Sequence, residues 1–385
     1  MKIGFIIAHP TQFEGPFFQY AAKDKEHQIR VIYTNPEHME KIFDPELSAS
    51  VSWGIDLLSG YSYATLPRSR RMRWLLADIN REKYDLLIIN GYSRSEYMQA
   101  CLLARLRGTP TALRLDSVQF GTASISNSLL KKINFLVLRN LFKHFFAAGS
   151  LTIEYLHHYG IKKERISLFS YAVDIDYFKE KSCSSVGAKN ELKRSYHLPD
   201  DSKVILSVTK FNDREAPWDL LKAFCSMRQD NLYLLLVGDG EQRASLEQYA
   251  REHPASRVIF AGYVPYTELP ALYGIADVFV HPVQHEPWGV SVHEALACGL
   301  PVIASSRVGA GYDLITPDKN GAIYEAGDAD DLRDKLARFL NPARRDDVCR
   351  ENELILSKWN YAASWRNILD AGRKYLSSQN GPANH

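Results

Sequence analysis

Short apolar segments recur along the chain and alternate with longer segments whose apolar positions have helical spacing. Apolar segments of this kind predict strands that are buried on both faces. In the first half of the chain they are Lys2–Ala8, Gln28–Tyr33, Asp85–Asn90, Thr111–Leu115 and Phe145–Ala148. In the second half they are Val204–Thr209, Leu232–Val237, Arg257–Ala261, Val278–His281, Pro301–Ala304 and Gly321–Tyr324. The alternation predicts an α/β protein with two Rossmann-like, doubly wound domains.

A polar segment rich in Ser, Gly and Lys, Ser182 to Leu198, separates the two sets of strands. We therefore expect an N-terminal domain at residues 1–180 and a C-terminal domain at 181–360. Residues 361–385 are predicted to form a last helix, to about Tyr375, followed by a loose polar tail.

The composition sets limits on the class of protein. A chain of 385 residues with 45% hydrophobic and 24% charged residues is long enough for two ordinary domains. The net charge of +2 gives no global attraction to nucleic acid. Five cysteines without metal-like spacing fit a reducing compartment, and we expect a cytoplasmic protein. No apolar segment is long enough to span a membrane, and the N-terminal one is expected to be a strand rather than a signal peptide.

The segment from Ala276 to Ser305 carries the most functional information. Its pattern predicts a strand, a loop containing Glu286 and Gly289, a helix from about Ser291, and a second strand. Ligands of parallel sheets bind at the carboxyl ends of the strands, where this loop and the acid Glu294 would lie. The backbone N–H groups at the helix start, at Gly289, Val290 and Ser291, suit an anionic ligand.

The two acids and their neighbours resemble a family signature. Glu286 with Pro-Trp-Gly after it, and Glu294 with Ala-Leu-Ala-Cys-Gly-Leu-Pro-Val after it, are similar to the donor site of family 4 retaining glycosyltransferases. The resemblance implies the GT-B fold, in which two Rossmann-like domains face each other across a cleft and the last helix crosses back to the first domain. It also implies that Glu286 lies near the transferred sugar, that Glu294 binds the ribose hydroxyls of a nucleotide sugar, and that no metal or cofactor is needed.

Further residues follow the strands of the first half. His9, Gln12 and Gly15 come after the first strand, Arg114 lies near the end of the fourth, and Asp116 follows it. Together with the segment Ala172 to Phe178 they resemble a bacterial subgroup that builds surface polysaccharides. The resemblance implies that Gly15 borders the donor phosphates, that His9, Gln12 and Arg114 face the acceptor or the other domain, and that Asp116 acts in catalysis. The alternative is a simple strand-to-helix turn.

A basic loop follows the strand Val204–Thr209. Cations at the end of a strand can stabilise the charge that builds on a departing diphosphate. The family usually has a basic residue at the position of Lys210 and a lysine five residues later, but this chain has Glu215 there, beside Arg214. Either Arg214 replaces the lysine, or Lys210 is the only cation for the diphosphate. The alternative is that Lys210 and Arg214 are solvated charges in the loop with no role in binding.

Three glycine turns complete the candidate donor site. Gly309 and Ala310 follow the strand Pro301–Ala304 and are predicted to offer backbone N–H groups to a phosphate or sugar. Gly238 opens a turn that borders the donor cleft, or else a hairpin-like turn with no ligand. The segment Gly262, Tyr263 and Val264 resembles the family segment that meets the nucleotide base, although Tyr263 could also serve in packing.

A basic and apolar segment occupies residues 129–146, within a stretch from Ser117 to Ile153 that contains no Asp or Glu. Residues 67–74 add four arginines and a tryptophan. Both suit an anionic membrane surface, and hence a peripheral location on the inner face of the plasma membrane, or a lipid diphosphate acceptor. The alternative is an ordinary amphipathic helix packed on the sheet. Nucleic-acid binding is not expected, because the rest of the chain is not basic.

The sequence therefore predicts a metal-independent glycosyltransferase that moves a sugar from a nucleotide sugar to a glycan or lipid-linked glycan in bacterial surface polysaccharide synthesis. Two alternatives stay open: a sugar-nucleotide epimerase on the same fold, and a non-catalytic partner in a glycan assembly complex. No phosphate-binding Gly-x-x-x-x-Gly-Lys loop and no Gly-x-Ser-x-Gly motif is present.

Overall fold

The computed structural model describes residues 1–35, 42–44, 49–51, 54–120, 125–227, 229–253, 257–341 and 345–379. The chain forms two compact units. Unit 1 is Met1–Glu40, Asp56–Ala172 and Trp359–His385, and unit 2 is Lys41–Ile55 and Val173–Lys358. The units divide at residues 172 and 358, and the domain division after residue 180 stays a prediction.

Unit 1 is built on a seven-stranded sheet in which every neighbouring pair is parallel. In spatial order its strands are β5 (Ser62–Thr65), β2 (Gln28–Tyr33), β1 (Lys2–Ile7), β6 (Leu86–Asn90), β7 (Thr111–Leu115), β8 (His144–Ala147) and β9 (Ile166–Leu168). Its helices are α1 (Glu14–Ala21), α2 (Arg71–Glu82), α3 (Ser95–Leu106), α4 (Ile125–Leu141), α5 (Ser150–His158), the 3-10 turn η2 (Lys163–Arg165) and α15 (Tyr361–Gln379).

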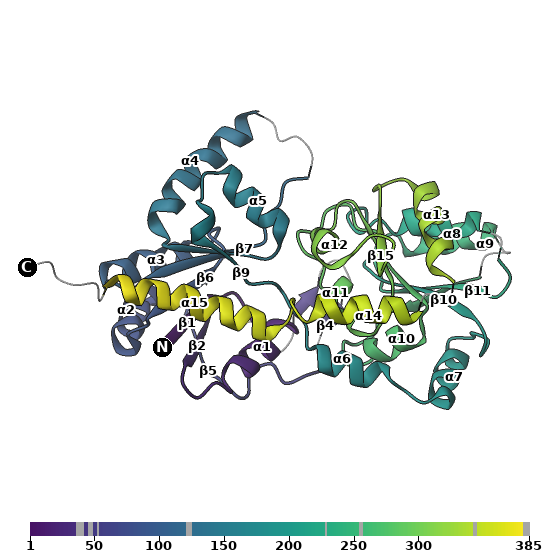
Figure 1. Cartoon of the computed structure of the whole chain (residues 1–385), viewed down its shortest axis with the longest axis horizontal. Coiled ribbons are helices and arrows are strands. Elements are labelled where there is room, and N and C mark those ends of the chain that lie inside the picture. Colours follow the sequence, from purple (N-terminus) through teal and green to yellow (C-terminus); the bar gives the residue numbers. More distant parts are fainter. Residues whose placement is uncertain are drawn as a thin grey trace, which may run out of the picture. The chain divides into compact units, whose positions relative to one another are not determined.

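Helices cover both faces of this sheet, as Figure 1 shows for α1 and α15 on one side and α4 and α5 on the other. Successive strand residues point to opposite faces, so β1 buries Phe5 against α1 and Ile6 against the helices of the other face. This two-sided burial is why the strands are mostly apolar.

The helix α15 completes the core of unit 1 from far along the chain. Ile368 and Leu369 are buried beside residues of α1 and β2. The indole N–H of Trp365 donates a 2.9 Å hydrogen bond to Asp24, which fixes the helix against the α1–β2 loop.

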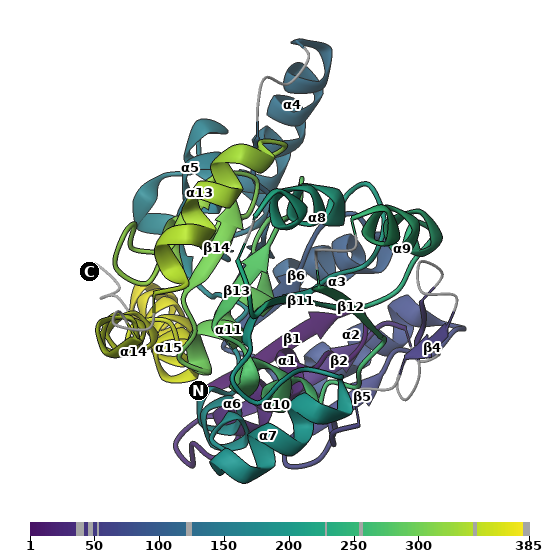
Figure 2. The same cartoon turned by 90° about the vertical axis from the view of Figure 1, so that its right-hand side faces the viewer.

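Unit 2 is built on a six-stranded parallel sheet. In spatial order its strands are β12 (Arg257–Gly262), β11 (Leu232–Val237), β10 (Lys203–Val208), β13 (Val278–His281), β14 (Val302–Ser305) and β15 (Gly321–Tyr324). Its helices are α6 (Ile175–Ser182), α7 (Val186–Ser195), α8 (Pro217–Ser226), α9 (Arg243–Glu252), α10 (Leu269–Ile275), α11 (Val290–Ala297), α12 (Gly309–Leu314), α13 (Ala329–Phe339) and α14 (Arg345–Leu356). Figure 2 shows α8 and α9 on one side of the strands and α6, α7 and α10 on the other.

The predicted α/β class with two doubly wound parallel sheets is confirmed. The edge strands β5 and β9, and the antiparallel pair β3 (Ile42–Asp44) and β4 (Ala49–Val51), were not predicted. Edge strands are covered on fewer sides, so they lack the apolar pattern: β5 is mostly exposed and β9 half-buried.

Two polar segments contain more helix than the sequence indicated. The segment Ser182 to Leu198, where the domain boundary was expected, contains the helix α7, which begins at the cap Ser185. The last helix continues to Gln379, beyond the predicted end at Tyr375. The rest of the predicted tail, 380–385, lies outside the described residues.

Candidate functional site

The sheet of unit 2 has a topological switch point between β10 and β13. Strand order runs outward from this pair in both directions, so the loops that follow the two strands leave the sheet side by side. The backbone N–H of Gln284, after β13, donates a 2.7 Å hydrogen bond to the carbonyl of Arg214, after β10. The fold thus brings together the basic loop and the Glu286 loop, which are far apart in sequence.

Arg214 lies between two carboxylates at this point. Its Nη2 pairs with Glu215, and its Nη1 lies 3.5 Å from Oε2 of Glu286. The side chains of Arg214 and Glu286 are 43% and 28% exposed, so a ligand could reach both. Lys210, in the same loop, is half-buried.

The Glu286 loop is also bonded to the Gly309 turn. The Glu286 N–H donates to Arg307, and the N–H groups of Gly309 and Ala310 donate to the carbonyls of Glu286 and Trp288, at 2.9, 2.9 and 2.7 Å. The two N–H groups that the sequence assigned to a ligand are therefore engaged inside the protein. A Cβ atom on Gly309 would lie 2.0 Å from the carbonyl oxygen of Pro287, so close packing accounts for this glycine.

The helix α11 places the second acid. Glu294 is buried, and Oε2 of its carboxylate accepts a 2.9 Å hydrogen bond from the hydroxyl of Tyr273. Burial raises the pKa of Glu294 to about 7, and the hydrogen bond from Tyr273 opposes that rise. At its start, α11 follows Gly289, whose φ of 106° favours glycine, and the first N–H groups, at Val290 and Ser291, have no acceptor within the helix.

A buried histidine supports the start of α11. His281 ends β13, and its Nδ1 lies 3.2 Å from the hydroxyl of Ser291. Desolvation and, as a smaller effect, the positive charge of Arg214 lower the pKa of His281 to about 3. The ring is therefore neutral near pH 7, and Nδ1 can accept the hydrogen bond of Ser291.

The glycines after β11 are required by packing. A Cβ atom on Gly238 would lie 1.9 Å from the carbonyl oxygen of Thr209. The chain continues into α9, which excludes the hairpin-like alternative. The N–H of Gly238 donates to the carbonyl of Gly262 at 2.8 Å, so this turn adjoins the end of β12. There Tyr263 is 42% exposed and Val264 is buried.

In unit 1, a buried ion pair joins the start of α1 to β7. Nη1 of Arg114 lies 2.8 Å from Oε1 of Glu14, and both side chains are almost fully buried. Thr11 and Asn90 donate further hydrogen bonds to the carboxylate, at 3.2 and 3.3 Å. Desolvation raises the pKa of Glu14 even though Arg114 opposes it. The guanidinium group of Arg114 is thus committed to contacts within unit 1.

The other predicted residues of unit 1 lie around this pair. Asp116 is half-buried and accepts a 3.3 Å hydrogen bond from Tyr171, whose ring packs on the guanidinium of Arg114. His9 and Gln12 are half-buried in the loop before α1. The missing side chain of Gly15 leaves room for Leu57, 2.9 Å from the position of a Cβ atom.

Sequence reasoning assigned no role to three residues of these sites, Glu14, Tyr273 and His281. Glu14 could have been noticed in the sequence, because it is an acid among the aromatic residues of the α1 segment. Tyr273 and His281 had no local signal, because each meets its partner only through the sheet.

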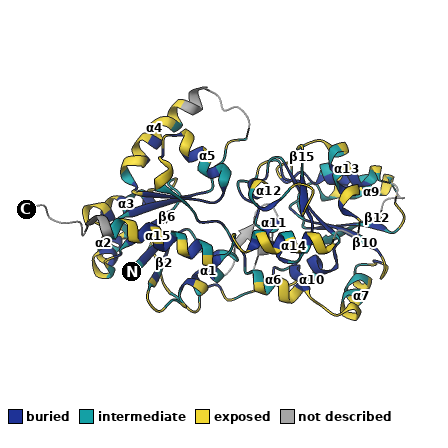
Figure 3. Ribbon diagram, in the orientation of Figure 1, coloured by how far each residue is buried: buried dark blue, intermediate teal, exposed yellow. Residues whose placement is uncertain are grey.

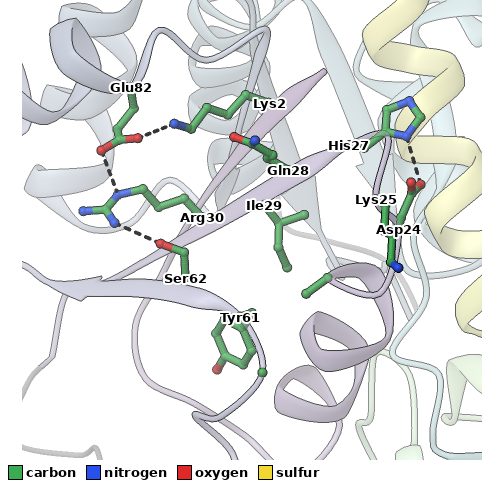
Figure 4. A pocket seen from close by; sticks show the side chains of 12 residues that line it. Lys2, Asp24, Lys25, His27, Gln28, Ile29, Arg30, Tyr61, Ser62 and Glu82 are labelled. Atoms are coloured by element: carbon green, nitrogen blue, oxygen red, sulfur yellow. Dashed lines mark hydrogen bonds and ion pairs between the residues drawn. The ribbon is translucent and has the colours of Figure 1, made fainter.

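A separate pocket in unit 1 is lined by polar side chains, among them Lys2, Arg30, His27 and Glu82 (Figure 4). Figure 4 shows these side chains paired with one another or with neighbours: Lys2 and Arg30 contact Glu82, and His27 contacts Asp24. Lys2 begins β1, so the pocket lies at the amino ends of the strands, opposite the edge where ligands of such sheets bind.

Within the described ranges, no group of three or more His, Cys, Asp or Glu residues is arranged to hold a metal ion. The same ranges contain no helix long and apolar enough to cross a membrane.

Comparison with known proteins matches part of the chain to a family of enzymes. Residues 188–353 match the model of the group 1 glycosyl transferases. The lipopolysaccharide core biosynthesis glycosyltransferase LpsE of Rhizobium meliloti is 24% identical over 338 residues, which cover 78% of this chain and 97% of LpsE. A GDP-mannose-dependent alpha-mannosyltransferase of Mycobacterium tuberculosis is 30% identical over 55% of this chain and 52% of its own length. The chain spans about half the length or less of the first curated relatives it matches.

Solved structures agree on the fold. A glycosyltransferase of Rickettsia africae superimposes with a TM-score of 0.73 at 16% identity, covering 97% of this chain and 98% of its own. HepE of Anabaena, solved with UDP and glucose, gives a TM-score of 0.70 at 16% identity, covering 98% and 100%. Residues 188–353 are thus similar to the group 1 glycosyl transferases, and the two parallel α/β sheets have the GT-B fold of the solved glycosyltransferase structures.

Proposed function

We propose that this protein is a retaining glycosyltransferase, which moves a sugar from a nucleotide sugar to a glycan or lipid-linked glycan in bacterial surface polysaccharide synthesis. The observation that carries the proposal is the meeting of Arg214 and Glu286 at the switch point of unit 2, with buried Glu294 on the helix that follows. Two similar proteins support it: LpsE is a lipopolysaccharide core biosynthesis glycosyltransferase, and HepE was solved with UDP and glucose and with UDP-glucose.

The donor would lie at the carboxyl ends of β10 to β14. Glu294 would accept hydrogen bonds from the ribose hydroxyls, and the start of α11 would face the diphosphate with its N–H groups. Exposed Tyr263 and the backbone of Gly262 would border the base. The Gly309 turn would act indirectly, because its hydrogen bonds hold the Glu286 loop in place.

During transfer, the bond between the sugar and the diphosphate breaks and negative charge builds on the leaving group. Lys210 would stabilise that charge, with Arg214 nearby. Glu286 would bind donor hydroxyls and stabilise the positive charge on the sugar ring. The departing phosphate oxygen then takes the acceptor proton, and the acceptor oxygen forms the new bond on the same face. Asp116 and the loop with His9 and Gln12 would serve the acceptor, and Arg114 would hold that loop through Glu14.

A surface of α4 supports a lipid-linked acceptor. Phe135 and Leu138 pack into the core, but a second row of apolar side chains is 47–63% exposed: Leu129, Leu130, Ile133, Leu136 and Val137. Figure 3 shows α4 largely exposed. Exposed Lys132, Arg139 and Lys143 lie on or just after the helix. Apolar side chains bordered by cations fit the interface of an anionic membrane, with the protein peripheral on its cytoplasmic side.

Thermal-shift measurements against a panel of nucleotide sugars that includes UDP-glucose and GDP-mannose, followed by product analysis with the best one, test the enzymatic proposal. We expect one donor to raise the melting temperature and to yield a product with retained anomeric configuration when a glycan acceptor is present. Conversion of the nucleotide sugar without an acceptor would indicate the epimerase instead. No stabilisation by any nucleotide would indicate the non-catalytic partner.

Co-sedimentation with vesicles tests the membrane surface. We expect binding to phosphatidylglycerol vesicles, weaker binding to phosphatidylcholine vesicles, and loss of binding in an Ile133→Asp, Val137→Asp double variant. Leu354→Asp, at a 54% exposed position of α14, is the matched control and should bind normally. If the double variant sediments like the wild type, α4 is not the docking surface.

A further inference from the structure

Glu215 is a buried acid in a loop of otherwise accessible charges. Only 8% of the residue is exposed. Its Oε2 accepts a 3.0 Å hydrogen bond from the hydroxyl of Thr209, and its backbone N–H donates to the side chain of Asn212 at 2.9 Å. These contacts fix the carboxylate at the end of β10, and its other oxygen faces Arg214.

The same contacts determine where the guanidinium group of Arg214 points. One terminal nitrogen pairs with Glu215 and the other lies 3.5 Å from Glu286. The backbone of Arg214 is tied to the Glu286 loop as well, through Gln284. A planar guanidinium bound on one side by a fixed, buried carboxylate has little freedom to turn toward another anion.

We infer that Glu215 is a positioning residue that holds the guanidinium of Arg214 against Glu286. Arg214 then serves the carboxylate that faces the sugar, and Lys210 is the cation for the diphosphate. This inference rests on the proposed function and deepens it. The paired charges of Arg214 and Glu215 largely cancel at the distance of a diphosphate, so together they add little to its binding.

The inference predicts that some substitutions in this loop slow sugar transfer, while another weakens the binding of the nucleoside diphosphate. Glu215→Gln removes the charge that orients Arg214, so transfer should fall about tenfold while the dissociation constant for the nucleoside diphosphate changes less than about twofold. Lys210→Gln should raise that dissociation constant by about tenfold or more. Arg214→Gln should lower transfer as Glu215→Gln does, with little effect on affinity.

A double-mutant cycle separates positioning from a general structural effect. If Glu215 acts through Arg214, the double variant Glu215→Gln, Arg214→Gln should transfer sugar no more slowly than Arg214→Gln alone. Asp213→Asn is the matched control: it removes a negative charge from the same loop at an exposed residue bonded to Gln242, and its transfer rate should equal that of the wild type. Melting temperatures of all variants check folding.

A ligand-free measurement accompanies the kinetics. Nitrogen-15 NMR of arginine side chains should show restricted rotation of the Arg214 guanidinium in the wild type and free rotation in Glu215→Gln. If nucleotide binds and transfer proceeds, but Glu215→Gln matches the wild type or the two substitutions are additive, the inference alone is wrong. If the wild type binds no nucleoside diphosphate, the proposed function is wrong and the inference falls with it.

Discussion

The hydroxyl of Tyr273 donates a 2.9 Å hydrogen bond to Oε2 of Glu294, and both side chains are buried in unit 2. The tyrosine bonds one carboxylate oxygen, and in the proposed function the ribose hydroxyls would bond the other. Burial raises the pKa of Glu294 to about 7, so the residue changes charge within the physiological range.

We predict that the affinity for the nucleotide sugar rises between about pH 6 and pH 8. Ribose hydroxyls donate more strongly to a carboxylate than to a carboxylic acid, so binding favours the ionised Glu294, whose population grows as the pH passes 7. Titration calorimetry across this range measures the effect. An intact nucleotide sugar is the correct probe, because a terminal phosphate monoester would itself titrate near pH 6.

The matched variants are Glu294→Gln and Glu294→Ala. Glu294→Gln should lose the pH dependence, and Glu294→Ala should bind about 1.5–3 kcal/mol more weakly. Because the folded pKa is raised above 4.5, wild-type stability falls as the pH rises through about 7, and Glu294→Gln escapes this loss. Unchanged affinity in a folded Glu294→Ala protein would rule out the ribose role.

Glu286→Ala should affect a different step. We expect a folded protein that binds the nucleoside diphosphate almost normally but transfers sugar at least tenfold more slowly, because the developing charge on the sugar loses one electrostatic contact. Steady-state rates and diphosphate affinity, measured on the same preparation, test this. A transfer rate within twofold of the wild type would refute the assignment.

The two glycines of the α12 turn should differ in their tolerance of alanine. A Cβ atom on Gly309 would lie 2.0 Å from a backbone oxygen of the Glu286 loop, whereas one on Gly311 would make only ordinary contacts at 3.6 Å. We expect Gly309→Ala to cost about 1–3 kcal/mol of unfolding free energy and to lower transfer. Gly311→Ala should be neutral or stabilising in urea denaturation. Equal effects of the two substitutions would contradict this account.

The buried pair of Glu14 and Arg114 should matter for stability. Arg114→Leu leaves a buried carboxylate without its cation, and breaking such a pair costs about 3–5 kcal/mol. The double variant Glu14→Leu, Arg114→Leu should recover part of that loss, as chemical denaturation can measure. Additive losses would mean that the two charges act independently.

Transfer should not depend on a divalent metal, because the diphosphate charge would be met by Lys210 and by the start of α11. We expect equal rates after dialysis against EDTA and after addition of magnesium or manganese. Activity that is lost to the chelator and restored by either ion would overturn this expectation.

The sequence predicted the sheets because most residues of their buried parallel strands are apolar. Five of the predicted strands, such as Leu232–Val237, have the bounds predicted, and the other six differ by one residue at one or both ends. The edge strands β5 and β9 were missed because their half-exposed residues lack that pattern.

Candidate site residues could be predicted where they belong to one local sequence pattern, as Glu286 and Glu294 do. Pairings across the sheet were not predictable. The contact of Arg214 with Glu286 requires β10 and β13 to be neighbours, and the pair of Glu14 and Arg114 joins the start of α1 to β7. The sequence also could not show that the N–H of Gly309 is unavailable to a ligand. That N–H donates its hydrogen bond to the carbonyl of Glu286 inside the protein.

The helix α15 belongs to unit 1 although unit 2 precedes it in the chain. During synthesis, the face of unit 1 that receives Ile368 and Leu369 therefore stays uncovered while residues 173–358 are made, roughly 10–40 s at ribosomal rates. During that interval the core of unit 1 is incomplete, and unit 2 can fold before unit 1 does. The first unit to be started is thus the last to be finished, and its exposed apolar face is the surface on which a chaperone would act.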